Sequence, residues 1–174
     1  MSIKIMSSVW EHSSQKATEL LALLALADFA DDHGICWPGL DRIAHKVRVD
    51  SVRYVRRIIR KLEEKGEIFT LPQSGQSGGR GYTNLYLVAS GMSAYEIEKA
   101  LIEHFKIAPA LAARIADYLI TLQNGGTFEG VKPSDPRLEL AVPNKGGLQT
   151  PQKLSVNKGG LQGPKGGPTD PPNP

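Results

Sequence analysis

The segment from residue 51 to residue 65 constrains the fold most strongly, because its apolar residues have the spacing of a helix with one buried face. They recur three and four positions apart, which aligns them in a single stripe. The residues of this stripe are Val52, Val55, Ile58, Ile59 and Leu62. Asp50 or Ser51 is suited to cap the start of the helix, and Gly66 is suited to end it. We therefore predict a helix at 51–65 that packs one face against the rest of the protein.

Basic side chains lie on the opposite face of this predicted helix. At ~100° per residue, three arginines fall opposite the apolar stripe and further polar residues flank them. The residues of this face and its flanks are Arg53, Tyr54, Arg56, Arg57, Arg60 and Lys61. Residues 42–65 carry nine basic and three acidic residues, whereas the whole chain has a net charge of only +3. Such concentrated positive charge is typical of a nucleic-acid contact surface, although an isolated charge run is more often a solvated helix face.

Two further helices are predicted before this one. The first runs from a cap at Ser13 or Ser14 to about Asp31, and the second, short helix runs from Leu40 to Val47. A short helix, a brief turn and a longer helix form the order of a helix-turn-helix, whose second helix enters the DNA major groove. Its N-terminal residues face base edges, so the expected readers are Asp50, Ser51, Arg53, Tyr54 and Arg57. The expected phosphate contacts are Arg56, Arg60 and Lys61, joined by His45 and Lys46 on the short helix.

Two strands follow, at Glu67–Leu71 and Tyr82–Val88, and the Gly-, Ser- and Gln-rich segment between them predicts a long hairpin loop. Arg80 near the end of this loop is a candidate to enter a minor groove or hold a phosphate; the alternative is a solvated side chain. The order of elements predicts an α+β fold, a winged helix-turn-helix of three helices and a two-stranded wing, as a DNA-binding domain over residues 1–90.

Residues 91–126 are predicted to form a pair of helices, one from Ser93 to about Phe105 and one from Pro109 to about Gln123. Two helices bury little surface alone, so they pack on the first domain or on a second copy of the chain. A homodimer is the commoner solution for a DNA reader. Residues 127–174 hold nine of the twelve prolines and one aromatic residue, which predicts a disordered tail.

The sequence offers no pattern for catalysis or for cofactor binding. Cys36 and the four histidines lack metal-ligand spacing, and no phosphate-binding loop or Ser-His-Asp set is recognisable. We therefore expect no enzyme, no metal and no cofactor, and we expect Cys36 to be buried. Trp37 is expected to pack between the first two helices. No apolar run approaches the ~20 residues of a membrane span, and no signal peptide is visible, so a cytoplasmic, nucleoid-associated protein without a membrane partner is expected.

Three segments together resemble a known family of domains: Leu23–Gly39, Val52–Ile68 and the loop end Gly79–Tyr86. Over about residues 8–88 they are similar to winged helix-turn-helix domains common in phage and plasmid replication initiators and related regulators. One departure is the turn Arg48–Asp50, which lacks the glycine often found there. The resemblance implies sequence-specific binding of double-stranded DNA within a replication initiator, with the C-terminal region recruiting replication proteins. A transcriptional regulator is the alternative; a protein-interaction winged helix is a third reading, which the basic residues disfavour.

Overall fold

The computed structural model describes residues 2–75 and 83–128. The elements, in chain order, are α1 (Ile3–His12), α2 (Ala17–Phe29), β1 (Ile35–Cys36), α3 (Leu40–Val47), α4 (Val52–Glu64), β2 (Ile68–Gly75), β3 (Thr83–Val88), α5 (Ala94–Glu103) and α6 (Pro109–Gln123). The predicted disordered tail at 127–174 lies outside the described residues except for its first two positions, and the predicted loop residue Arg80 lies outside them too.

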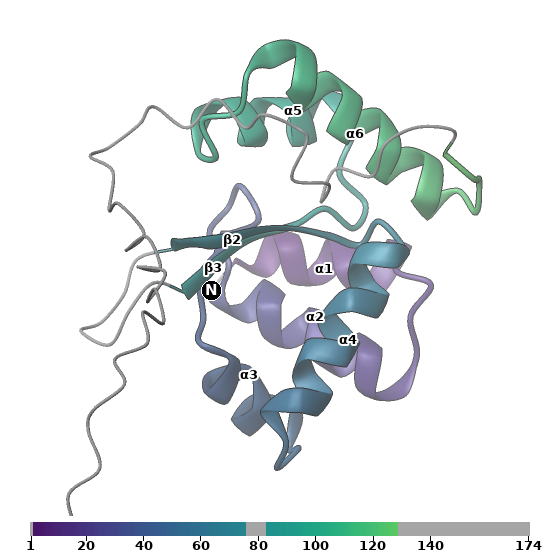
Figure 1. Cartoon of the computed structure of the whole chain (residues 1–174). Coiled ribbons are helices and arrows are strands. Elements are labelled where there is room, and N and C mark those ends of the chain that lie inside the picture. Colours follow the sequence, from purple (N-terminus) through teal and green to yellow (C-terminus); the bar gives the residue numbers. More distant parts are fainter. Residues whose placement is uncertain (1, 76–82, 129–174) are drawn as a thin grey trace, which may run out of the picture. The chain divides into compact units, whose positions relative to one another are not determined.

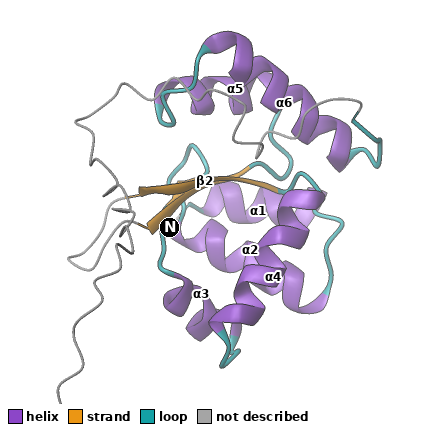
Figure 2. Ribbon diagram, in the orientation of Figure 1, coloured by secondary structure: helices purple, strands orange, loops and turns teal. Residues whose placement is uncertain are grey.

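A small antiparallel sheet in the order β1-β3-β2 lies between two groups of helices (Figure 1). Alternate residues of each strand face opposite sides, as strand geometry requires. On β3, Tyr86 and Val88 join the core formed with α1–α4, while Leu85 and Leu87 join the core formed with α5 and α6. Figure 2 shows these two helical groups, in the same orientation, on either side of the strands. The sheet is therefore buried on both faces, and the predicted α+β class is confirmed.

The helices at 40–47 and 51–65 form where the sequence predicts them. The Ser51 hydroxyl caps α4 by accepting a hydrogen bond from the Tyr54 backbone N–H at 3.3 Å. The turn between the helices works without glycine because Arg48 adopts the left-handed conformation, with φ 59° and ψ 43°. The backbone N–H of Val49 then donates to the Ala44 carbonyl at 3.0 Å, which is the bond that closes a Schellman motif.

The N-terminal region differs from the prediction of a single helix that starts at Ser13 or Ser14. A separate helix, α1, precedes it, and α2 begins only at Ala17. The two serines do not cap α2, because the Ser13 hydroxyl and the Ser14 backbone N–H both donate to the buried carboxylate of Glu67, at 3.0 and 3.2 Å. These bonds hold the α1–α2 loop against the end of α4.

The sheet also differs from the predicted two-stranded wing. A third strand, β1, pairs with β3, with Ile35 opposite Leu87 and Cys36 opposite Tyr86. Cys36 is buried as expected, and burial raises the pKa of its thiol. The expected position of Trp37 between two helices is wrong: the residue is 45% exposed and is not among the residues that pack on the core formed with α1–α4.

Helices α5 and α6 pack on the sheet of the same chain, which is one of the two arrangements that the sequence left open. Their apolar residues share a core with Phe69, Leu85 and Leu87 of the strands. The Gln123 side chain donates to the carbonyls of Gly66, at 2.8 Å, and Ala89, at 3.1 Å. A homodimer and the division into separate domains at 1–90 and 91–126 stay predictions. Among the described helices, none has the length and apolar character needed to cross a membrane.

Candidate nucleic-acid interface

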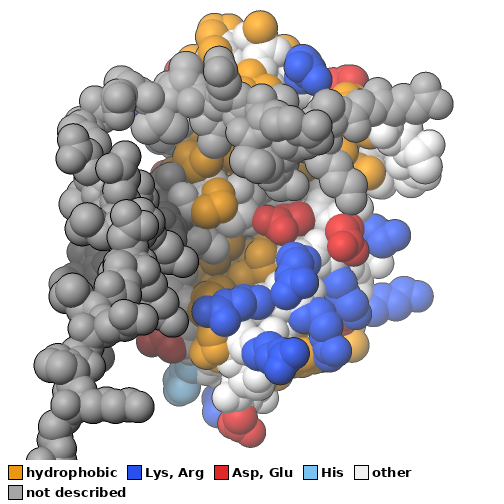
Figure 3. All heavy atoms as spheres, in the orientation of Figure 1, with side chains coloured by type: hydrophobic (Ala, Val, Ile, Leu, Met, Phe, Trp, Pro, Cys, Tyr) orange, Lys and Arg blue, Asp and Glu red, His pale blue; other side chains and the backbone are white. Residues whose placement is uncertain are grey.

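The exposed face of α4 carries a dense group of cations. Figure 3 shows Lys and Arg side chains gathered on the surface over this helix. The sequence-predicted residues exposed there are Arg53, Arg56, Arg57, Arg60 and Lys61. The opposite face is buried in the core, at Val55, Ile58, Ile59 and Leu62. The predicted helical face is therefore the one that points outward, and the apolar stripe fixes its direction.

Arg57 is oriented by the aromatic ring of Tyr54 on the preceding turn. Its guanidinium carbon lies 4.7 Å from the ring centroid, within the range of a cation–π contact. Tyr54 is half-buried and packs against the core, so the ring itself is held in place. This pair sits in the N-terminal half of α4, beside the cap at Ser51. Asp50 is exposed at the same end.

Lys61 is engaged by an acidic residue of α2. Its ammonium group donates to the Glu19 carboxylate, with 2.6 Å between Nζ and Oε1. This hydrogen bond lowers the pKa of Glu19, and the positive charges of Lys61 and Arg57 act in the same direction. This contact joins residues 42 positions apart, and no local sequence pattern predicts it.

Lys46 on α3 also forms an ion pair with an acidic residue of α2, Asp28 near the end of that helix.

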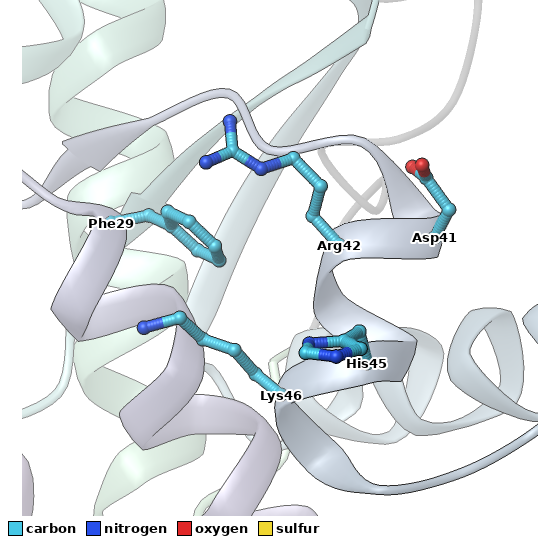
Figure 4. A pocket seen from close by; sticks show the side chains of 5 residues that line it. All are labelled: Phe29, Asp41, Arg42, His45 and Lys46. Carbon is cyan, nitrogen blue, oxygen red and sulfur yellow. The ribbon is translucent and has the colours of Figure 1, made fainter.

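An open pocket lies between α2 and α3. Its volume is about 410 Å³, and it is lined by Phe29, Asp41, Arg42, His45 and Lys46. Figure 4 shows the side chains of Arg42 and Lys46 both reaching from α3 toward the ring of Phe29. The guanidinium carbon and the ammonium nitrogen lie 4.9 and 4.7 Å from the ring centroid.

Arg42 is a candidate contact that the sequence analysis did not assign. It lies four residues before Lys46, so the two side chains share one face of α3, and His45 lines the same pocket. The spacing of four residues between Arg42 and Lys46 is the sequence pattern that could have identified Arg42 as a candidate contact. The structure thus brings His45 and Lys46 together in one pocket on α3, while the arginines form a separate row on α4.

The comparisons with known proteins place this surface in a recognisable kind of domain. Residues 16–68, which include α2, α3 and α4, match the family model described as a helix-turn-helix domain. The chain is also 35% identical over 69 residues to Protein YmfN of Escherichia coli (strain K12), covering 38% of this chain. That match spans only 15% of the length of the relative. No solved structure matches the chain. Residues 16–68 are therefore similar to helix-turn-helix domains, a kind of domain that binds DNA.

Proposed function

We propose that this protein binds double-stranded DNA in a sequence-specific manner, with α4 as the recognition helix in the major groove. The observation that carries the proposal is the row of exposed arginines on α4, directly opposite a face that is buried in the core. A B-DNA major groove accepts one α-helix, and arginine reads guanine with two hydrogen bonds. Arg53 and Arg57 act as base readers, whereas Arg56 and Arg60 hold phosphates.

The hairpin of β2 and β3 acts as the wing in this proposal. It follows α4 directly, and the two strands pair antiparallel from Ile68 opposite Val88 to Gly75 opposite Thr83. Arg80, which lies between these strands in the sequence, reaches the DNA backbone or the minor groove. The pocket residues Arg42, His45 and Lys46 hold phosphates at the other end of the interface.

The cellular role that we propose is DNA binding within a phage- or plasmid-type replication initiator, with replication proteins recruited by the C-terminal region. The resemblance of residues 8–88 to initiator domains supports this role. Mapping the DNA bound by the protein across a genome tests it. Binding at origin-type repeats is expected, whereas binding confined to promoters would replace replication with transcriptional regulation.

DNA binding itself is tested by measuring affinity for duplex DNA at several salt concentrations. Cations that hold phosphates release counterions, so affinity falls steeply as salt rises. Arg57→Ala is expected to cost ~1–3 kcal/mol on a preferred site and to flatten the preference at one base pair. Arg56→Ala is expected to weaken binding to all sequences and to reduce the salt slope by about one.

Lys99→Ala is the matched control, because it removes one exposed cation from α5, away from α4. It should leave affinity nearly unchanged. The absence of duplex binding at low salt would refute the proposed function. Equal effects of Arg57→Ala and Arg56→Ala on every sequence would refute the separation into base readers and phosphate contacts.

A further inference from the structure

The cations of the proposed interface fall into two classes, according to whether the protein already supplies an anion to them. Lys61 and Lys46 are each paired with a carboxylate from α2, Glu19 and Asp28 respectively. In the described part of the chain, no carboxylate lies within ion-pair distance of the arginines of α4. Lys46 and Lys61 are thus already paired with carboxylates of the protein, whereas the arginines of α4 are available to bind an external anion.

We propose that Glu19 and Asp28 are internal counter-ions of the DNA interface, which DNA phosphates displace and which thereby set its affinity for duplex DNA. This inference rests on the proposed function and adds two acidic residues to it. α2 packs against both α3 and α4, so it presents its carboxylates to the edges of the cationic surface. Neither residue is expected to contact DNA.

The geometry of the Glu19 pair permits such an exchange. The Lys61 side chain is 54% exposed and that of Glu19 is 21% exposed, so solvent and a phosphate both have access to the ammonium group. Exposed ion pairs of this kind are weak, because each charge keeps much of its hydration. A phosphate that approaches Lys61 is repelled by the negative charge of Glu19 unless that carboxylate moves away from the ammonium group. Each pair therefore removes part of the favourable interaction between its lysine and DNA.

Neutralising one counter-ion should strengthen DNA binding. Glu19→Gln keeps the shape of the side chain and removes its charge, so Lys61 becomes fully available to a phosphate. From the usual strength of an exposed ion pair, we expect affinity to rise about 1.5- to 5-fold. The dependence of affinity on salt should become steeper, by up to about 0.9 in the logarithmic slope, because one more cation neutralises a phosphate. Asp28→Asn should act in the same direction through Lys46.

Glu11→Gln on α1 is the matched control, because it makes the same change in net charge at an exposed carboxylate without an ion-pair partner among the described residues. The second control is the double variant Glu19→Gln with Lys61→Ala. If Glu19 acts through Lys61, then Glu19→Gln changes affinity far less in the Lys61→Ala background than in the native chain. Thermal melting of each variant establishes that the fold is retained.

The measurement is the affinity of the full chain for one duplex of random sequence, over a range of salt concentrations. A rise with Glu19→Gln that exceeds the rise with Glu11→Gln and disappears without Lys61 supports the inference. Equal rises in both variants, or a Glu19→Gln effect that persists in Lys61→Ala, would overturn it and leave DNA binding itself intact. If the native chain binds no duplex at low salt, the proposed function fails instead.

Discussion

Among the glycines that follow helices, Gly66 is the one whose replacement with alanine should destabilise the protein most. Gly66 terminates α4 with φ +69°, a conformation that residues with a Cβ atom adopt at a cost. A Cβ atom at this position would lie 2.5 Å from the backbone oxygen of Leu119 and 2.9 Å from the Cβ of Leu122. Both atoms belong to α6, so the added methyl group pushes that helix away from the end of α4.

The expected size follows from these two contributions. The left-handed conformation costs roughly 1–2 kcal/mol for a residue other than glycine. Forcing an extra methyl group into a packed contact costs about 1–3 kcal/mol more. The free energy of unfolding should therefore fall by about 2–5 kcal/mol. At roughly 3 °C per kcal/mol for a chain of this size, the melting temperature falls by about 6–15 °C.

Gly125→Ala separates the two contributions. Gly125 has nearly the same backbone conformation, with φ +75°, but a Cβ atom there would meet nothing within 4 Å. This variant should lose only the conformational part, about 1–2 kcal/mol. Thermal unfolding followed by circular dichroism measures both variants. If Gly66→Ala is no less stable than Gly125→Ala, then α6 is not seated against the end of α4 in solution, and the reasoning is refuted.

Two further variants test the electrostatics and the turn. Burial raises the pKa of the Glu63 carboxyl, against the smaller lowering effects of Thr70 and Arg60. Because the folded state binds the Glu63 proton more tightly, this group stabilises folding at low pH, and that stabilisation is lost as pH rises through the raised pKa. Glu63→Gln should therefore raise the melting temperature at pH 7. It should also reduce the fall in melting temperature that the native protein shows as pH rises above the ordinary glutamate range. Arg48→Gly should be more stable than Arg48→Ala by about 1–2 kcal/mol in urea unfolding, because glycine adopts the left-handed backbone conformation without the steric cost of a Cβ atom. Equal stability of the two variants would contradict this.

The sequence predicted α3, α4 and α6 well because local patterns determine them. In α4, the apolar residues three and four positions apart form one face, and the cap at Ser51 and the stop at Gly66 mark both ends. The outward direction of the arginines follows from the same pattern. In α1, only Ile5 and Val9 are buried, and its cap is the second residue of the chain, Ser2. Two apolar residues one turn apart are too few to distinguish a helix from a loop by periodicity.

Local sequence patterns could not predict which charged residues near the candidate site are paired or buried. Lys61 looks like a free cation in the sequence, and only the packing of α2 against α4 brings Glu19 to it. Glu67 looks like the polar first residue of a strand. Folding instead buries it to 3% exposure, with donors from the α1–α2 loop around one oxygen. Contacts between residues more than 40 positions apart depend on the tertiary structure, and no periodicity encodes them.

Contacts at both ends of α4 fix the direction of its exposed arginines, and the proposed recognition of DNA depends on that direction. At the N-terminal end, the left-handed Arg48 and the Ser51 cap set the angle between α3 and α4. At the other end, Gln123 of α6 donates to the carbonyl of Gly66, and Glu67 binds the α1–α2 loop. A reading side chain has to meet a base edge within hydrogen-bond distance, so a tilt of the helix at either end would misplace Arg53 or Arg57. In the proposed function, helices α5 and α6 thus contribute to sequence reading by fixing the position of α4, even though they carry none of the proposed DNA contacts.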